Sequence, residues 1–280
     1  AEEELNLNAT ALEFDFCDSP VEKRSLEQCW ISRSPWFYGL KHPQRHDART
    51  LFNWLATADS AELGRSWIMH PSPRFIELTG HILKQMFIDG TQLSYDAIDL
   101  GIRRIRQLDD EMYKCHNGVR WRHFIESDFA VQSLAGEDPV RSKSVRDQFL
   151  GESVTYNTMS CRMAVSTKFH DMHSPTVAKL QECIAKCIDT FYTGWYPDWE
   201  GWITRFFAVD NQEAIRCSQN SGIIALLAAR DFDGSKISSL VGQDYDSVLS
   251  TFKMTMLYEL LSIKGNFAKV PSAFVQSVED

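Results

Sequence analysis

Residues 221–229 read Ser-Gly-Ile-Ile-Ala-Leu-Leu-Ala-Ala, and no other stretch of the sequence is as informative about the fold. Beyond Ser221 this stretch has no polar side chain, which is typical of a helix buried on most of its surface. We expect the helix to begin at Ser221, whose hydroxyl can cap the first turn, and to run to about Ala229. A helix of this kind requires other elements packed around it, so the sequence predicts a globular domain.

Toward the N-terminus, three more helices are predicted. Apolar residues recur at helical spacing from Pro73 to Gly90. A second helix follows Ser94 as its N-cap residue and presents an apolar stripe up to Leu108. Residues 121–134 are expected to form the third.

Toward the C-terminus, helices alternate with short strands. Ser174 and Pro175 have the residue types of an N-cap and a first helical position, and residues 245–263 predict a long amphipathic helix. Strands are expected near residues 161–166 and 203–209. The fold class predicted from these elements is α+β, helix-rich with a small mixed sheet.

The first part of the chain has a different character. Residues 1–64 contain short aromatic and proline phrases without a sustained period, so we interpret them as a loop-rich N-terminal arm or cap. Residues 65–280 then form the predicted main domain.

Composition narrows the classes of function. The formal charge of -9 and the pI near 5.4 disfavour wholesale binding of nucleic acid, and we interpret the local cluster Arg103, Arg104 and Arg106 as a solvated helix face. The sequence has no run of 18 consecutive apolar residues, so no membrane span is expected. Seven scattered cysteines indicate reduced thiols. Together with an acidic start unlike a signal peptide, they predict an intracellular protein, nuclear or cytoplasmic.

Several phrases, taken in order over roughly residues 65–275, resemble one family. These phrases lie at residues 67–71, 93–110, 122–129, 149–151, 161–163, 221–223, 229–234 and 257–266. The chain resembles plant-type ubiquitin-like-specific proteases, the cysteine peptidases that remove SUMO, many of whose plant members lie in transposon-derived genes. The resemblance implies a papain-like fold and thiol-dependent hydrolysis of the bond after a C-terminal glycine. It implies no cofactor and no metal.

The resemblance also implies that catalysis is impaired. The family nucleophile is a cysteine that precedes a glycine at the start of a buried helix, where the helix dipole favours a thiolate; here that position holds Ser221. The glutamine of the oxyanion hole falls on Ile215. The His-Trp strand has no counterpart between Val165 and Phe169, as though a segment were deleted. Asp171 is the triad position that has a match.

Other residues compete for these roles. Cys217 is a surrogate nucleophile, and His170 adjoins Asp171 on a segment that we expect to be extended. Two cysteines, Cys183 and Cys187, share a helix face with His170 and His173 nearby, but their spacing matches no zinc pattern, so we interpret them as core thiols.

The family reaction therefore predicts a SUMO protease homologue with little or no activity, whose partner is a ubiquitin-like protein such as SUMO or its conjugates. Two alternatives stay open. One is an active cysteine peptidase that uses Cys217. The other is a non-enzymatic protein-binding domain of a domesticated transposon gene.

Overall fold

The computed structural model describes the backbone of most of the chain: residues 8–13, 45–113, 122–152, 154, 156, 158, 163–166, 170–195, 203–207, 211–231 and 244–274. Among these residues, no helix is long and apolar enough to cross a membrane.

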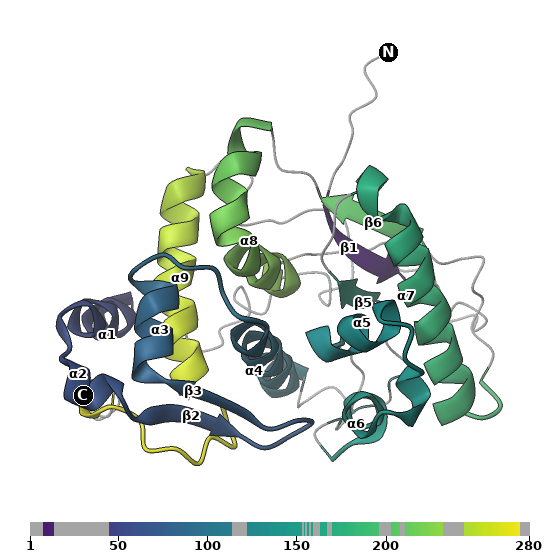
Figure 1. The fold of residues 1–280 in the computed structure, drawn as a ribbon, viewed down its shortest axis with the longest axis horizontal. Helices are drawn as coiled ribbons and strands as arrows, with labels where there is room; N and C mark the ends of the chain where they lie inside the picture. Colours follow the sequence, from purple (N-terminus) through teal and green to yellow (C-terminus); the bar gives the residue numbers. More distant parts are fainter. Residues whose placement is uncertain are drawn as a thin grey trace.

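Helices dominate the described part of the chain. They are α1 (Arg45–Thr57), α2 (Ser60–Leu63), α3 (Gly80–Phe87), α4 (Tyr95–Tyr113), α5 (Ser127–Leu134), the 3-10 helix η3 (Pro139–Arg141), α6 (Lys143–Leu150), α7 (His170–Phe191), α8 (Asn211–Asp231) and α9 (Tyr245–Leu261). Figure 1 shows α1, α3, α4, α8 and α9 gathered on one side and α5, α6 and α7 on the other.

Six described strands form two sheets. These strands are β1 (Asn8–Glu13), β2 (Ser66–His70), β3 (Ile76–Thr79), β4 (Arg122–Phe124), β5 (Met163–Ser166) and β6 (Ile203–Phe207). The four-stranded sheet has the order β4-β5-β1-β6, in which β4 and β5 are parallel and the other pairs antiparallel. Strands β2 and β3 form an antiparallel hairpin. The predicted α+β class with a small mixed sheet is confirmed.

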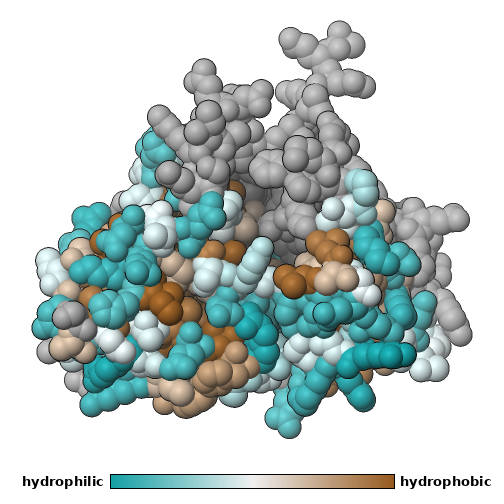
Figure 2. Space-filling view, in the orientation of Figure 1, coloured by the Kyte–Doolittle hydropathy of each residue, from teal (hydrophilic) through white to brown (hydrophobic). Residues whose placement is uncertain are grey.

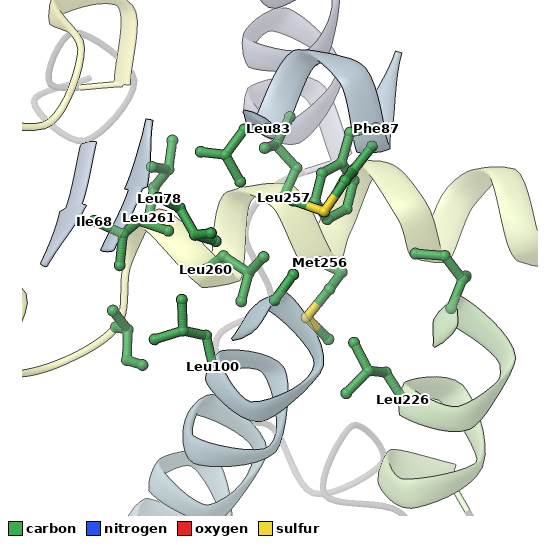
Figure 3. Packing of buried hydrophobic residues seen from close by; sticks show 14 of the residues in the cluster. Ile68, Leu78, Leu83, Phe87, Leu100, Leu226, Met256, Leu257, Leu260 and Leu261 are labelled. Atoms are coloured by element: carbon green, nitrogen blue, oxygen red, sulfur yellow. The ribbon is translucent and has the colours of Figure 1, made fainter. Parts of the chain in front are cut away.

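The larger apolar core surrounds α9. Figure 3 shows Met256, Leu257 and Leu260 of this helix packed between Leu100 of α4 and Phe87 of α3. Because α9 contacts α1, α3, α4, α8 and β2, apolar residues occur around most of its circumference. Burial of each large side chain contributes about 1.5–3 kcal/mol relative to exposure.

A second core lies between α5, α6 and α7. Its fully or nearly buried members include Phe129, Val145, Phe149, Ile184 and Cys187. Both cysteines of α7, at positions 183 and 187, are buried free thiols, as the sequence predicts. Burial raises the pKa of Cys187 to about 12, so this thiol stays protonated at neutral pH.

Several element boundaries differ from the sequence predictions. Residues 76–79, expected in a helix, form β3, because Ile76 and Leu78 alternate with exposed Glu77 and pair with β2. Residues 122–124, also expected to be helical, form β4 beside β5.

The N-terminal prediction also needs correction. Residues 45–63, assigned to a loop-rich arm, form α1 and α2, and Leu51, Leu55 and Leu63 are buried in the larger core. The predicted helix after Ser94, by contrast, is confirmed, and the Ser94 hydroxyl accepts a hydrogen bond from the Ala97 backbone at 3.2 Å.

Candidate functional site

Ser221 lies in the middle of α8 and not at a helix start. The helix begins at Asn211, so the prediction that it starts at Ser221 is wrong. In the interior of a helix the backbone N–H groups bond to carbonyls one turn earlier. Ser221 therefore lacks the free amides and the positive dipole end that would favour a thiolate or hold an oxyanion. Its side chain is exposed, whereas residues 222–224 are buried.

Gly222 has a packing reason that is independent of catalysis. A Cβ atom at this position would lie 2.8 Å from Leu93 Cβ and 3.3 Å from Ile98 Cδ1. On the facing helix, a Cβ at Gly101 would lie 2.6 Å from the methyl groups of Leu226. The two glycines thus let α4 and α8 approach each other closely.

Three further candidate residues lie in helices. Cys217 precedes Ser221 by one turn of α8. His170 and Asp171 form the start of α7, so the prediction that they lie on an extended segment is wrong, and the helix continues through Pro175. Their expected arrangement on opposite faces of a strand does not apply. The side chains of Cys217, His170 and Asp171 lie outside the described residues, and their roles stay predictions.

The described part of the chain holds no group of three or more His, Cys, Asp or Glu residues that could bind a metal ion.

The polar groups that the structure does bring together lie around α4. Arg103, Arg104 and Arg106 are all buried, so their interpretation as a solvated helix face is wrong. Arg104 Nε donates to Glu259 of α9 at 2.6 Å. Helix α4 contacts α5, α8, α9 and β3, which leaves little of its surface in water.

Arg103 occupies the centre of this cluster. Its Nε and Nη2 atoms donate to the two carboxylate oxygens of Glu126 at 2.9 and 2.8 Å, and both side chains are almost fully buried. Its Nη1 lies 3.0 Å from Nδ1 of His70. Because a guanidinium can only donate, Nδ1 of His70 must be the acceptor.

His70 is consequently a neutral histidine with its proton on Nε2, which donates to the Lys264 carbonyl at 3.1 Å. Burial and the charge of Arg103 lower its pKa to about 4. The close approach uses Gly265, which has a φ of 85° and would place a Cβ 3.3 Å from His70 Nε2.

A second buried histidine lies on β4. Nδ1 of His123 is 2.8 Å from the Tyr156 hydroxyl, and burial lowers the pKa of His123 to about 3. No described residue bonds to its Nε2. Neither His123 nor His70 is seen bonded to the Ser221 hydroxyl.

Arg122 joins α4 to the end of α8. Its Nε and Nη2 donate to Asp109 at 3.1 and 2.6 Å, and its Nη1 donates to the carbonyls of Ala229 and Arg230 at 2.7 and 2.8 Å. A cation at a helix C-terminus complements the dipole and satisfies carbonyls that lack helical partners.

Sequence reasoning missed this buried network because it interpreted the arginines of α4 as a solvated face and assigned them no acidic partner. One signal was available: Asp99, Arg103 and Arg106 recur at intervals of four and three residues, which places them on one helix face. Comparison with known proteins adds no further identification, since no protein-family model, curated protein or solved structure matches this chain.

Proposed function

We propose that this chain is a degenerate relative of the ubiquitin-like-specific proteases that binds a ubiquitin-like protein such as SUMO and does not hydrolyse its conjugates. One observation carries the loss of catalysis: Ser221, at the position of the nucleophile, is exposed in the interior of α8. A serine there has neither a helix N-terminus beside it nor a bonded histidine among the described side chains to take its proton.

The papain-like fold belongs to this proposal. It is supported by the helix-rich α+β architecture, by the small mixed sheet and by the contact of α8 with β1, a neighbour of β5 in that sheet. Close packing of α8 on α4 explains Gly222 without any catalytic role, so the Ser-Gly pair can persist in a protein that only binds.

Binding and cleavage are separable by experiment. The purified chain is passed over immobilised SUMO, and in parallel it is incubated with a SUMO precursor and a SUMO conjugate. We expect retention on the resin and no cleavage. Cleavage that disappears in a Cys217→Ala variant would instead identify an active cysteine peptidase. If the chain is neither retained on the resin nor able to cleave, the proposal is refuted. The chain would then be an interaction domain with a different partner.

A variant pair tests whether the surface at Ser221 takes part in binding. Ser221→Arg places a long, charged side chain on the exposed face of α8, and we expect it to weaken binding to the SUMO resin at least about tenfold, or about 1.4 kcal/mol. Ser250→Arg is the matched control, because Ser250 is also exposed but lies on α9. Equal retention of both variants would place the binding surface elsewhere.

A further inference from the structure

The molecule has two lobes, each with its own apolar core. The large lobe comprises the hairpin β2–β3 with α1–α4, α8, α9 and the strand β4, whose Phe124 packs in the larger core. The small lobe comprises α5, α6 and α7 (Figure 1). Among the described residues, no apolar side chain belongs to both cores. At β4 the chain passes from one core to the other within two residues, since Phe124 packs in the large core and Ile125 in the small one. The chain also leaves the small lobe through β5, between α6 and α7, and through β6, after α7.

Where the lobes meet, the described contacts are mostly polar. The bidentate pair of Arg103 and Glu126 lies at this seam. Beside it, Asp99 Oδ1 accepts from the backbone N–H of Ser127 at 2.7 Å, and Asp99 Oδ2 accepts from the Ser127 hydroxyl at 2.9 Å. Asp99 of the large lobe thus supplies the capping oxygen that Glu126, the N-cap residue of α5, does not provide.

The small lobe is held together by contacts of its own. The Gln148 side chain of α6 accepts from the Glu126 backbone N–H at 2.7 Å and donates to Asp128 of α5 at 2.6 Å. Asp128 also accepts from Ser144 at 2.5 Å. The small lobe therefore has both an apolar core and a hydrogen-bond network that survive if the seam separates.

A polar seam opens differently from an apolar one. When a buried ion pair separates into water, both charges recover their hydration, which offsets much of the lost attraction. Opening an apolar interface exposes hydrocarbon with no such compensation. The one aromatic contact described across the seam, between the rings of His123 and Phe149 with centroids 5.1 Å apart, also involves a polar side chain.

We propose that the small lobe opens from the large lobe as a single unit, before global unfolding, with the Arg103–Glu126 pair as the latch and the Phe124–Ile125 junction as the hinge. This inference does not depend on what the protein binds. Its consequence is a populated open state in which the amides of α5 and α6 exchange together while α4 and α9 stay protected.

Hydrogen exchange of the wild-type chain tests the inference without any mutation. We expect the amides of α5 and α6 to share one opening event and to exchange at least about tenfold faster than those of α4 and α9. Exchange of both lobes through one global event, at equal rates, would overturn the proposal.

Three variants test the latch. Glu126→Gln removes one charge and leaves Arg103 buried and unpaired, so exchange in α5 and α6 should rise about 10²-fold or more. Asp147→Asn is the matched control, because Asp147 pairs with Lys143 on the surface of the small lobe; it should change exchange less than about fivefold.

The double variant Arg103→Met with Glu126→Leu makes the seam apolar, and it keeps the test decisive if Glu126→Gln fails to fold. It should open no faster than wild type, since well-packed apolar residues can replace a buried ion pair without loss. Fast opening of the double variant, with exchange in α5 and α6 as rapid as 10²-fold above wild type, would contradict the role of the pair as a latch.

Discussion

Ser221 and Arg103 stand on neighbouring helices, α8 and α4, and differ in how their surroundings support them. Arg103 is 1% exposed, and its three polar contacts, to both oxygens of Glu126 and to His70, lie within 3.0 Å. Ser221 is exposed and has no described hydrogen-bond partner for its hydroxyl. The position that resembles a nucleophile is therefore the less organised of the two.

Catalysis would need the hydrogen-bonded side chains to lie around Ser221 and not around Arg103. A nucleophile requires a base within hydrogen-bond reach and an orienting partner behind that base. In this molecule such tightly bonded side chains are found inside the fold, where they join α4 to β4, α5 and α9. Polar order here serves the architecture, and in our proposal the exposed surface around Ser221 contacts the partner.

Figure 2 adds a second feature of the surface, a hydrophobic area over the β2–β3 hairpin. Phe75 directly precedes β3, and the backbone N–H of Phe267 donates to the carbonyl of Met69 in β2. The two side chains are 53% and 58% exposed, with ring centroids 6.2 Å apart. The described residues leave both rings about half exposed.

The largest effect is expected from removing a buried charge partner. Arg122→Ala leaves Asp109 buried without its bidentate partner and leaves the last carbonyls of α8 without their donor. We expect a loss of about 3–5 kcal/mol in the free energy of unfolding, measured by chemical denaturation. Arg141→Ala is the control: this arginine is exposed and 3.6 Å from Asp138, so its loss should cost less than about 1 kcal/mol. Similar losses in both variants would contradict the structural role of the buried network.

Acid should destabilise the fold through its neutral histidines. His123 has a pKa of about 3 in the folded protein and an ordinary value of 6.5 when unfolded. The unfolded state thus takes up the proton first, and the stability conferred by the neutral ring is complete above pH 6.5 and is lost as the pH falls toward 3. Between pH 7 and 4.5 the free energy of unfolding should fall by about 2–3 kcal/mol through His123 alone.

Burial raises the pKa of the Glu126 and Glu259 carboxyl groups, which acts in the opposite direction. The informative quantity is therefore the difference between the pH profiles of wild type and His123→Phe. The variant loses the hydrogen bond to Tyr156, which should lower its free energy of unfolding by the same amount at every pH. Its free energy of unfolding should also change less with pH than that of the wild type. Parallel profiles would show that His123 does not stay neutral.

A smaller effect is expected where α4 and α8 touch. Gly222→Ala forces a methyl group against Cβ of Leu93, the fixed end of that side chain, and overpacking costs about 1–3 kcal/mol. Better helix propensity returns about 1 kcal/mol. Gly101→Ala gains the same propensity and meets the end of the Leu226 side chain, with both methyl groups at 2.6 Å and Cγ at 3.2 Å. Because a side-chain end can shift where a Cβ atom cannot, it should be the more stable variant. Thermal unfolding measures the stabilities of the two variants. A Gly222→Ala variant more stable than Gly101→Ala would show that the glycines do not set the separation of α4 and α8.

The comparison of Ser221 with Arg103 also shows how far sequence reasoning reached. Residue periodicity and capping chemistry located α4, α9, β5 and β6, because their signals are local. The surroundings of Arg103 were not predictable, because its partner Glu126 is supplied by another element and charged residues on helices usually face water.

The prediction that a helix begins at Ser221 was wrong for a different reason. A serine before an apolar run is a good N-cap residue, but residues 211–220 contain no glycine or proline to stop a helix. The helix therefore continues back to Asn211, itself a residue type favoured at helix starts. Similarly, β3 depends on pairing with β2, which local periodicity does not reveal.

The most direct test of the proposed loss of catalysis is covalent labelling at position 221. Ser221→Cys is prepared in a Cys217→Ala background and exposed to SUMO carrying a thiol-reactive C-terminal group. Because position 221 lies in a helix interior and the members of a catalytic triad act as a unit, restoring the thiol alone should give no SUMO adduct above that of the Cys217→Ala parent. A stoichiometric adduct at position 221 would show that a working base and oxyanion site remain, and would contradict the account.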